Sequence, residues 1–348
     1  SFNIICIATQ GIYLKRLKDI GISINDKISI NRKISILSDI ISIIKLTIFF
    51  IKTKPDIVHT FSPKANLLGM IGAYFSRVPK RVVSVGGHYY ESKKGLWKKF
   101  FMFFESLTYH FSTVVLVNSF HLKLEIINRF PKSAEKIRIL GYGATNGIDL
   151  QHFTPENSKP DYKLILEKFN YQKDQLIISY TGRMNFDKDI FTLIDSIKEI
   201  PDSNIRLLLI GDIEDQNGYK NAFFSKIAND KRIVHISLQE DIKTFLSISS
   251  IYVHPSLREG LSNSIMEACA MKIPCVVSSI PGNLELIEHQ VTGLTAEKSD
   301  IKAFKYQIKR LINDKNMRIE IGERARQNVK SKYDQKIVWA NIKRFYNE

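Results

Sequence analysis

Apolar and polar residues alternate along this chain in blocks that predict short buried strands separated by amphipathic helices. Runs of apolar, often β-branched residues end in polar turns, and segments with a helical period follow them in both halves of the chain. This order predicts an α/β fold built on doubly wound parallel sheets. The expected strands cover residues 3–8, 22–30, 56–60, 81–85, 114–119, 176–181, 206–210, 233–238, 250–254 and 273–279.

Several of the predicted helices carry start or stop signals. Gly21 ends the first, and a serine-aspartate pair at residues 38–39 starts the second, which extends to about residue 52. From Ser299 on, the apolar period predicts two helices, the last over residues 335–346. The other helices are expected to open at residue 62 and to cover residues 95–107, 241–249 and 265–271.

The chain of 348 residues is long for one hydrophobic core and suits two domains. The segment 155–160 is polar and contains two prolines, which is typical of a hinge between domains. We therefore expect one domain over residues 1–155 and a second that begins at residue 156.

The turn between the predicted strand 250–254 and the helix 265–271 has the features of an anion site. Gly260 makes the turn flexible, and Ser262 or Asn263 can serve as the helix N-cap. The first amides of a helix have no partner within it and lie at the positive end of its dipole. This arrangement is suited to phosphate.

Two glutamates bracket this turn, Glu259 before the helix and Glu267 within it. Eight helical positions span about 12 Å, comparable to a nucleoside diphosphate sugar measured from ribose to hexose. Carboxylates bind vicinal hydroxyls well because their hydrogen bonds are charge-assisted. One glutamate could hold the sugar and the other the ribose; the alternative is a helix cap beside one surface glutamate.

The order of these features resembles the donor-binding segment of the retaining glycosyltransferases of family 4, which have the GT-B architecture. In that family a strand ends in Pro-Ser and is followed by Glu-Gly, a small turn, a helix with a second Glu, a buried strand and a Pro-Gly turn. Here the matching stretch runs from Pro255 to Gly293. The resemblance covers nearly the whole chain, including residues 55–69 and 141–155, and is weaker in the first thirty residues.

The resemblance implies a role for each matching residue. Arg183 and Lys188, in a Gly-Arg-x4-Lys turn, would hold the donor diphosphate, and cations there would also neutralise the departing nucleoside diphosphate. Glu259 would position the hexose and Glu267 the ribose. The segment Gly260, Leu261, Ser262 and Asn263 would contribute backbone amides.

A histidine that faces the sugar usually follows the strand at residues 81–85 directly in this family. Gly86 occupies that position here, and His88 stands two residues later. His88 can reach the same space because the glycines free the backbone, and the alternative is a histidine in a surface loop. We count His88 with Glu259, Arg183 and Lys188 as the candidate catalytic residues.

The family implies three further features of the architecture. Members usually begin with one more strand and a glycine-rich loop, so the first domain is expected to lack its first strand. The second domain would cover residues 156–330, and the last helix, residues 331–348, would pack back on the first domain. Such enzymes need no bound metal, and the sequence contains no clear metal-ligand cluster.

The net charge of +16 is concentrated in the first half of the chain. Residues 1–150 contain 22 Lys/Arg and 9 Asp/Glu, and the remainder contains 29 and 26. No nucleic-acid-binding module accompanies this charge. Tryptophan, phenylalanine and lysine alternate over residues 95–107, which is typical of an interfacial helix at a membrane; the alternative is a core helix with a basic end.

The sequence also bears on the compartment. No apolar segment is long enough to span a bilayer, and no signal peptide is visible. Cys6, Cys269 and Cys275 lie in apolar runs without metal-ligand spacing, which predicts buried free thiols in a reducing compartment. We expect a cytoplasmic protein, peripheral on the inner face of the membrane.

Together these features predict a retaining glycosyltransferase that moves a hexose or hexosamine from a nucleoside diphosphate sugar, most simply a UDP-sugar. The expected acceptor is a lipid-linked saccharide in bacterial surface polysaccharide synthesis, and no cofactor is expected. The alternatives are a GT-B sugar-nucleotide epimerase and a non-catalytic sugar-nucleotide-binding remnant. Binding to nucleic acid is a weaker alternative that rests on charge alone.

Overall fold

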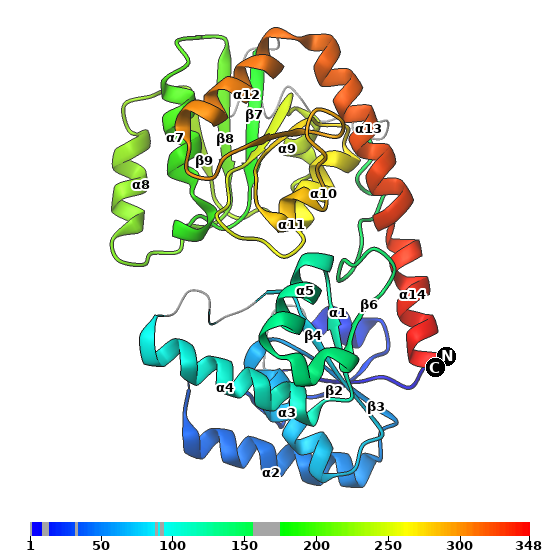
Figure 1. Ribbon diagram of the computed structural model, residues 1–348. Coiled ribbons are helices and arrows are strands. Elements are labelled where there is room, and N and C mark those ends of the chain that lie inside the picture. Colours follow the sequence, from blue (N-terminus) through cyan, green and yellow to red (C-terminus); the bar gives the residue numbers. More distant parts are fainter. Residues whose placement is uncertain (1, 9–13, 32–33, 88–89, 91–93, 156–174) are drawn as a thin grey trace. The chain divides into compact units, whose positions relative to one another are not determined.

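The computed structural model describes residues 2–8, 14–31, 34–87, 90, 94–155 and 175–348 (Figure 1). Contacts divide the chain into two compact units. Residues 1–118 and 122–139 form the first unit, and residues 119–121 and 140–348 form the second. Each unit is built around parallel strands, as the alternating pattern predicts.

The first unit contains a four-stranded parallel sheet in the order β3-β4-β5-β6 and a separate parallel pair, β1 and β2. Helix α3 contacts both α2 and α4, so these three helices form one layer. The strands are β1 (Ile5–Ile7), β2 (Ser23–Asn25), β3 (Ile57–Phe61), β4 (Lys80–Val85), β5 (Val114–Val117) and β6 (Ile137–Ile139). The helices are α1 (Leu14–Asp19), α2 (Ile36–Thr53), α3 (Pro63–Phe75), α4 (Gly95–Phe111) and α5 (Phe120–Arg129), with a 3-10 helix at Pro131–Lys136.

The second unit contains a six-stranded parallel sheet in the order β12-β11-β10-β7-β8-β9. The direction of winding reverses between β7 and β10, and open α/β sheets bind ligands beyond the carboxyl ends of the strands at such a switch point. The strands are β7 (Leu176–Thr181), β8 (Ile205–Ile210), β9 (Ile233–Ile236), β10 (Ile251–His254), β11 (Cys275–Ser278) and β12 (Leu294–Ala296). The helices are α7 (Ile190–Lys198), α8 (Tyr219–Ile227), α9 (Lys243–Ser247), α10 (Asn263–Ala270), α11 (Pro281–Leu284), α12 (Ile301–Asn313), α13 (Lys315–Tyr333) and α14 (Gln335–Asn347).

Two predictions for the N-terminal strands are wrong. The strand expected over residues 22–30 is only β2, and the strand expected to be buried over residues 3–8 is the short and partly exposed β1. The cause is pairing, because among the described residues β1 and β2 pair only with each other, so little protein covers them. Cys6 in β1 is accordingly partly exposed, whereas Cys269 and Cys275 are buried free thiols as predicted.

The C-terminal part forms three helices instead of the two predicted. Asp300, Asp314 and Asp334 cap α12, α13 and α14, and their side chains accept hydrogen bonds from first-turn amides. Asp314 is both the C-cap of α12 and the N-cap of α13. The break therefore has no glycine or proline to reveal it in the sequence.

The division into units falls near residue 139, whereas the sequence places the hinge near residue 155. Segment 140–155 belongs to the second unit because Ile148 exchanges backbone hydrogen bonds with the start of α14. Its amide donates to the carbonyl of Tyr333 at 2.8 Å, and its carbonyl accepts from the amide of Gln335 at 2.9 Å. The packing of the last helix on the first domain stays a prediction.

Candidate active site

The turn after β7 carries the predicted phosphate-binding cations. Gly182 begins it with φ 144°, and a side chain on Gly211, at the end of β8, would come within 2.1 Å of the Gly182 carbonyl oxygen. The two strand ends therefore approach closely because residue 211 is glycine. Asn185 then caps a short 3-10 helix, Phe186–Lys188, by accepting from the Lys188 amide at 3.2 Å, which fixes the start of the lysine side chain.

The turn after β10 is joined to this first turn. The Leu257 amide donates to the Asp187 carbonyl at 2.8 Å, and the Arg258 guanidinium pairs with the Asp187 carboxylate at 2.6 Å. From the other side, Ser278 donates a hydrogen bond to the Ser256 carbonyl. The segment that carries Glu259 is therefore held against the segment that carries Lys188 at the switch point of the sheet.

One oxygen of Glu259 is the centre of the site. Oε1 accepts from His254 Nε2 at 2.7 Å and from Ser256 Oγ at 2.9 Å, and it contacts the Lys188 ammonium. The His254 side chain is 1% exposed, that of Glu259 13% and that of Lys188 19%. Among the described residues, the second oxygen, Oε2, has no hydrogen-bond partner.

The charge states of this cluster follow from its contacts. Burial alone would raise the pKa of Glu259, but the hydrogen bond from His254 and the ammonium of Lys188 hold it well below its ordinary value. Burial lowers the pKa of His254 despite the opposing carboxylate, so its ring is neutral near pH 7 and Nε2 carries the proton that it donates. The site therefore holds an ionised carboxylate beside one cation.

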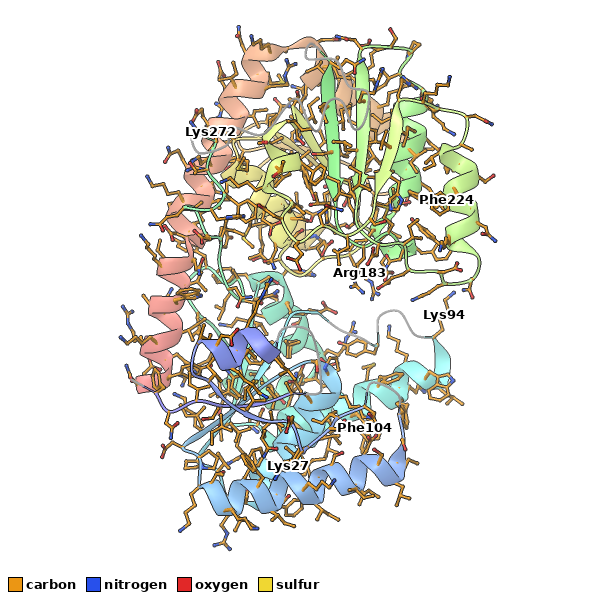
Figure 2. All side chains as sticks on the ribbon, turned by 180° about the vertical axis from the view of Figure 1, so that it is seen from behind. Lys27, Lys94, Phe104, Arg183, Phe224 and Lys272 are labelled. Atoms are coloured by element: carbon orange, nitrogen blue, oxygen red, sulfur yellow. The ribbon has the colours of Figure 1, made fainter. Side chains whose placement is uncertain are left out.

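Arg183 lies at the carboxyl edge of the sheet, as Figure 2 shows, and its side chain is 67% exposed. Its Nη1 pairs with Glu214 Oε1 at 2.5 Å, and the other oxygen of Glu214 accepts from Asn185 at 2.7 Å. Burial would raise the pKa of Glu214, but these hydrogen bonds from Asn185 and Arg183 lower it overall. Arg183 is thus connected to Lys188 through Glu214 and Asn185, and it does not contact Glu259.

Helix α10 begins next to Glu259, with Ser262 as its N-cap. The Ser262 side chain does not cap the helix, because its Oγ bonds to Ser264 Oγ at 3.0 Å instead. Leu261 is buried in the core, while Asn263 faces solvent. The first-turn amides therefore remain open to an anion at the end of the turn.

Glu267 lies one turn inside α10 and is half-buried. Burial raises the pKa of Glu267 to about 7, and among the described residues its carboxyl has no hydrogen-bond or ion-pair partner. A partly buried carboxyl of this kind can accept from the hydroxyls of a ligand without first giving up another partner.

The structure thus brings Lys188 and Glu259 into contact, places Gly260 to Asn263 at the adjoining helix start, and puts Glu267 on the same helix. Arg183 is on the same edge of the unit but paired elsewhere, and His88 lies outside the described residues. The roles expected for these site residues remain predictions.

The described residues contain no group of three or more His, Cys, Asp or Glu that could hold a metal ion. In the described part of the chain, no helix has the length and hydrophobicity needed to cross a bilayer.

Sequence reasoning missed His254, Ser256 and Glu214. His254 and Ser256 flank Pro255 and lie three to five residues before Glu259, so both were visible in the turn motif as polar groups next to the key carboxylate. Glu214 follows the Gly211 turn, and only the pairing of β7 with β8 shows that it faces Arg183.

Two family models match consecutive parts of the chain. The model described as "Glycosyltransferase Family 4" covers residues 26–152, and that described as "Glycosyl transferases group 1" covers residues 161–328.

Two curated relatives are similar over most of their length. The capsular polysaccharide biosynthesis glycosyltransferase CapM of Staphylococcus aureus is 33% identical over 340 residues, which is 96% of this chain and 87% of CapM. The UDP-Gal:alpha-D-GlcNAc-diphosphoundecaprenol alpha-1,3-galactosyltransferase of Escherichia coli is 30% identical over 83% of this chain and 74% of its own length.

Solved structures share the fold. A glycosyltransferase from Rickettsia africae matches 98% of this chain and 89% of its own with a TM-score of 0.82 at 21% identity. HepE of Anabaena, solved in complex with UDP and glucose, matches 99% and 91% with a TM-score of 0.84 at 18% identity. At this identity the likeness shows the fold alone, and it confirms two Rossmann-like domains of the GT-B type.

Proposed function

The chain belongs to glycosyltransferase family 4 and is a glycosyltransferase, and we propose that it moves a hexose or hexosamine from a UDP-sugar to a lipid-linked saccharide with retention of the anomeric configuration. The observation that carries this proposal is the contact of Lys188 with the mostly buried carboxylate of Glu259, directly before the start of α10. Groups that can bind a phosphate therefore lie next to a group that can bind sugar hydroxyls.

The diphosphate of the donor fits the cations and the helix start. An ammonium has three donors, and the contact with Glu259 uses one, so Lys188 can also bind a phosphate oxygen. The amides at Leu261 to Asn263 supply further donors at the positive end of the α10 dipole. Arg183 would reach the terminal phosphate from the exposed edge of the sheet.

The two carboxyls would hold the sugar rings. Glu259 presents Oε2 to the hexose hydroxyls while Oε1 stays fixed by His254, Ser256 and Lys188. Glu267, one turn inside α10, would accept from the ribose hydroxyls. A carboxylate that is already locked by three donors loses little conformational freedom when it binds.

In the reaction, the bond between the anomeric carbon and the UDP oxygen breaks, and a bond to the acceptor hydroxyl oxygen forms on the same face of the sugar. The proton of that hydroxyl passes to the departing diphosphate. The negative charge that develops on UDP lies where Lys188, Arg183 and the α10 amides stabilise it. These groups supply the stabilisation that a divalent metal supplies elsewhere, so we propose that no metal is required.

The names of two relatives support the proposed substrate class. The E. coli relative is named for UDP-Gal and a diphosphoundecaprenol-linked GlcNAc, and a Campylobacter jejuni relative with 23% identity is named for a diphospho-undecaprenol-linked acceptor as well. We propose the same class for this chain, a UDP-sugar and a polyprenyl diphosphate saccharide.

A lipid-linked acceptor requires access to a membrane, and helix α4 has a suitable surface. Leu96, Trp97 and Phe103 are exposed on it, next to Lys98 and Lys99. Only its C-terminal turns, at Thr108 and Tyr109, are buried. This pattern supports an interfacial helix over a core helix, and we propose that the protein is peripheral on the cytoplasmic face of the membrane.

A thermal-shift screen of UDP-, GDP- and dTDP-sugars tests the donor, because a ligand that binds the native state raises its melting temperature. We expect stabilisation by UDP and UDP-sugars, followed by transfer of the sugar to a polyprenyl diphosphate saccharide. Conversion of the sugar nucleotide without any acceptor would indicate an epimerase instead. Binding without turnover for any acceptor would indicate a non-catalytic remnant.

A further inference from the structure

Helix α2 carries apolar side chains on two opposite faces. Leu46 and Phe50 are buried in the core of the first unit. At about 100° per residue, Ile44 and Ile48 lie on the opposite side of the helix from Leu46. The outer face consists of six residues, each between 44% and 73% exposed: Leu37, Ile40, Ile41, Ile44, Ile48 and Ile51.

Such a face differs from the ordinary surface of a soluble helix. A helix that packs on a core normally presents polar residues to water on its other side, and a helix that is apolar all round is normally covered. Contiguous exposed apolar patches mark sites of interaction. The face extends along most of an 18-residue helix, which is about 27 Å at 1.5 Å per residue.

The charges on α2 indicate what covers this face. The helix contains one acidic residue, Asp39, whose carboxylate is paired with Lys64 at 2.6 Å. Lys45 and Lys52 are exposed beside the isoleucines. Two copies of this face brought together would place lysines beside lysines with no free carboxylate on α2 to pair them, whereas anionic headgroups would complement them.

We propose that α2 is a membrane-docking helix, which lies in the plane of an anionic bilayer surface with its outer isoleucines among the acyl chains and its lysines at the headgroups. The proposal extends the membrane contact suggested for α4 to a second helix of the same layer, since α3 contacts both (Figure 1). It rests on the proposed use of a lipid-linked acceptor, but the contact itself can be measured without any substrate.

The test is co-sedimentation of the full chain with vesicles of phosphatidylglycerol and phosphatidylcholine, compared with vesicles of phosphatidylcholine alone. The variant Ile44→Asp/Ile48→Asp places two carboxylates on the outer face and leaves the buried face intact. Ile319→Asp is the matched control, because Ile319 is 54% exposed on α13 of the second unit. Circular dichroism and light scattering report folding and oligomeric state.

We expect the wild type to bind the anionic vesicles, the double variant to lose about tenfold or more in partition coefficient, and Ile319→Asp to bind like the wild type. Lys45→Gln/Lys52→Gln should lose about 30-fold on anionic vesicles only. Wild-type-like binding by the double isoleucine variant overturns the proposal. So does a wild-type dimer that this variant dissociates, because the face would then be an interface between two copies.

Two further measurements keep the outcome interpretable. If the aspartate variant does not fold, Ile44→Ser/Ile48→Ser removes the same apolar surface without adding charge, and the same loss is expected. Transfer to a short-chain, water-soluble acceptor should be unchanged in the double variant. Loss of vesicle binding with intact transfer supports the docking role, whereas a wild type that binds vesicles but transfers no sugar contradicts the proposed reaction alone.

Discussion

Glu259 is a mostly buried carboxylate that three chemically different donors hold in its ionised form. A hydroxyl, a neutral imidazole and an ammonium all reach Oε1, from Ser256, His254 and Lys188. Hydrogen bonds to a charged group contribute about 1.5–3 kcal/mol each, which offsets the cost of removing the carboxylate from water. The consequence is a fixed acceptor, Oε2, whose position does not depend on the ligand.

We expect Lys188→Met to lower kcat by about 10²–10³, because it removes charge stabilisation from the departing diphosphate. The protein should stay folded, since Glu259 keeps its bonds to His254 and Ser256. Steady-state transfer and a thermal melt measure both effects. Lys226→Met is the matched control, because Lys226 pairs with Asp195 at 2.8 Å away from the site and should transfer normally. Equal loss in both variants would mean that the effect comes from stability.

The hexose contact is tested by Glu259→Gln, which keeps the shape of the side chain but removes its charge. Loss of a charge-assisted hydrogen bond should lower kcat/KM by about 10- to 100-fold. Binding of UDP alone, measured by calorimetry, should change much less, because UDP lacks the hexose. A variant that loses UDP and UDP-sugar affinity equally would contradict a contact with the sugar.

The raised pKa of Glu267 predicts that the stability of the protein depends on pH. Its carboxyl titrates at about 7 in the folded protein, and an unfolded glutamate titrates near ~4.3. Between these values the native state holds a proton that the unfolded chain has lost, so the free energy of unfolding falls as pH rises and then levels off above about 7. Glu267→Gln should therefore stabilise the protein by about 3–4 kcal/mol at pH 8 and by only about 1 kcal/mol near pH 5.

Thermal unfolding across this pH range measures the effect, with the exposed Glu297→Gln as control. The same Glu267→Gln variant should bind UDP more weakly if the carboxyl meets the ribose. An increase in stability together with unchanged UDP affinity would leave Glu267 as a strained residue without the proposed contact.

The helices and strands show where local pattern is sufficient and where it is not. The turn from β10 into α10 is visible in the sequence because a strand-forming run, Pro255, Gly260 and Ser262 all agree on one local structure. The predicted strands at residues 3–8 and 22–30 are longer than β1 and β2, because the pattern of apolar residues does not show which partners a strand will have. The boundary at Asp314 was missed because a single aspartate ends one helix and caps the next.

Gly282 packs closely against the loop that carries Glu259, so Gly282→Ala should disturb the site. A methyl group at Gly282, in α11, would lie 2.3 Å from the carbonyl oxygens of both Glu259 and Gly260. The donor loop must shift to admit it, so we expect a loss of about 1–3 kcal/mol in stability and a marked loss of UDP-sugar affinity. Gly322→Ala is the control, because its methyl would come within 2.1 Å of the Lys272 carbonyl.

Both variants should melt at lower temperature, and only Gly282→Ala should lose donor binding in calorimetry. Similar donor affinity in the two variants would show that the position of the 259–260 loop does not control the site.

Across the whole chain, the two-domain organisation and the GT-B type follow from the sequence, while the convergence of the site does not. Lys188 and Glu259 are 71 positions apart, and they meet because β7 and β10 are neighbours at the switch point of one sheet. The link from Arg183 to Glu214 depends in the same way on the pairing of β7 with β8. The predicted boundary near residue 155 reflects the same limitation, since a polar, proline-bearing stretch marks a linker and does not show which unit the preceding residues join.

The uneven charge of the chain predicts how membrane binding responds to salt. Most of the net charge of +16 lies in residues 1–150, and Lys98 and Lys99 stand beside the exposed Trp97 of α4. A lysine near an anionic surface contributes about 1 kcal/mol, so Lys98→Gln/Lys99→Gln should weaken binding to phosphatidylglycerol vesicles about 30-fold at low salt. At about 1 M salt, where the screening length is about 3 Å, the affinities of wild type and variant for the vesicles should converge.

Lys302→Gln/Lys309→Gln removes the same charge from α12 and should bind like the wild type at every salt concentration. If both variants lose affinity equally, the protein binds by its total charge and the basic first unit has no special part in docking.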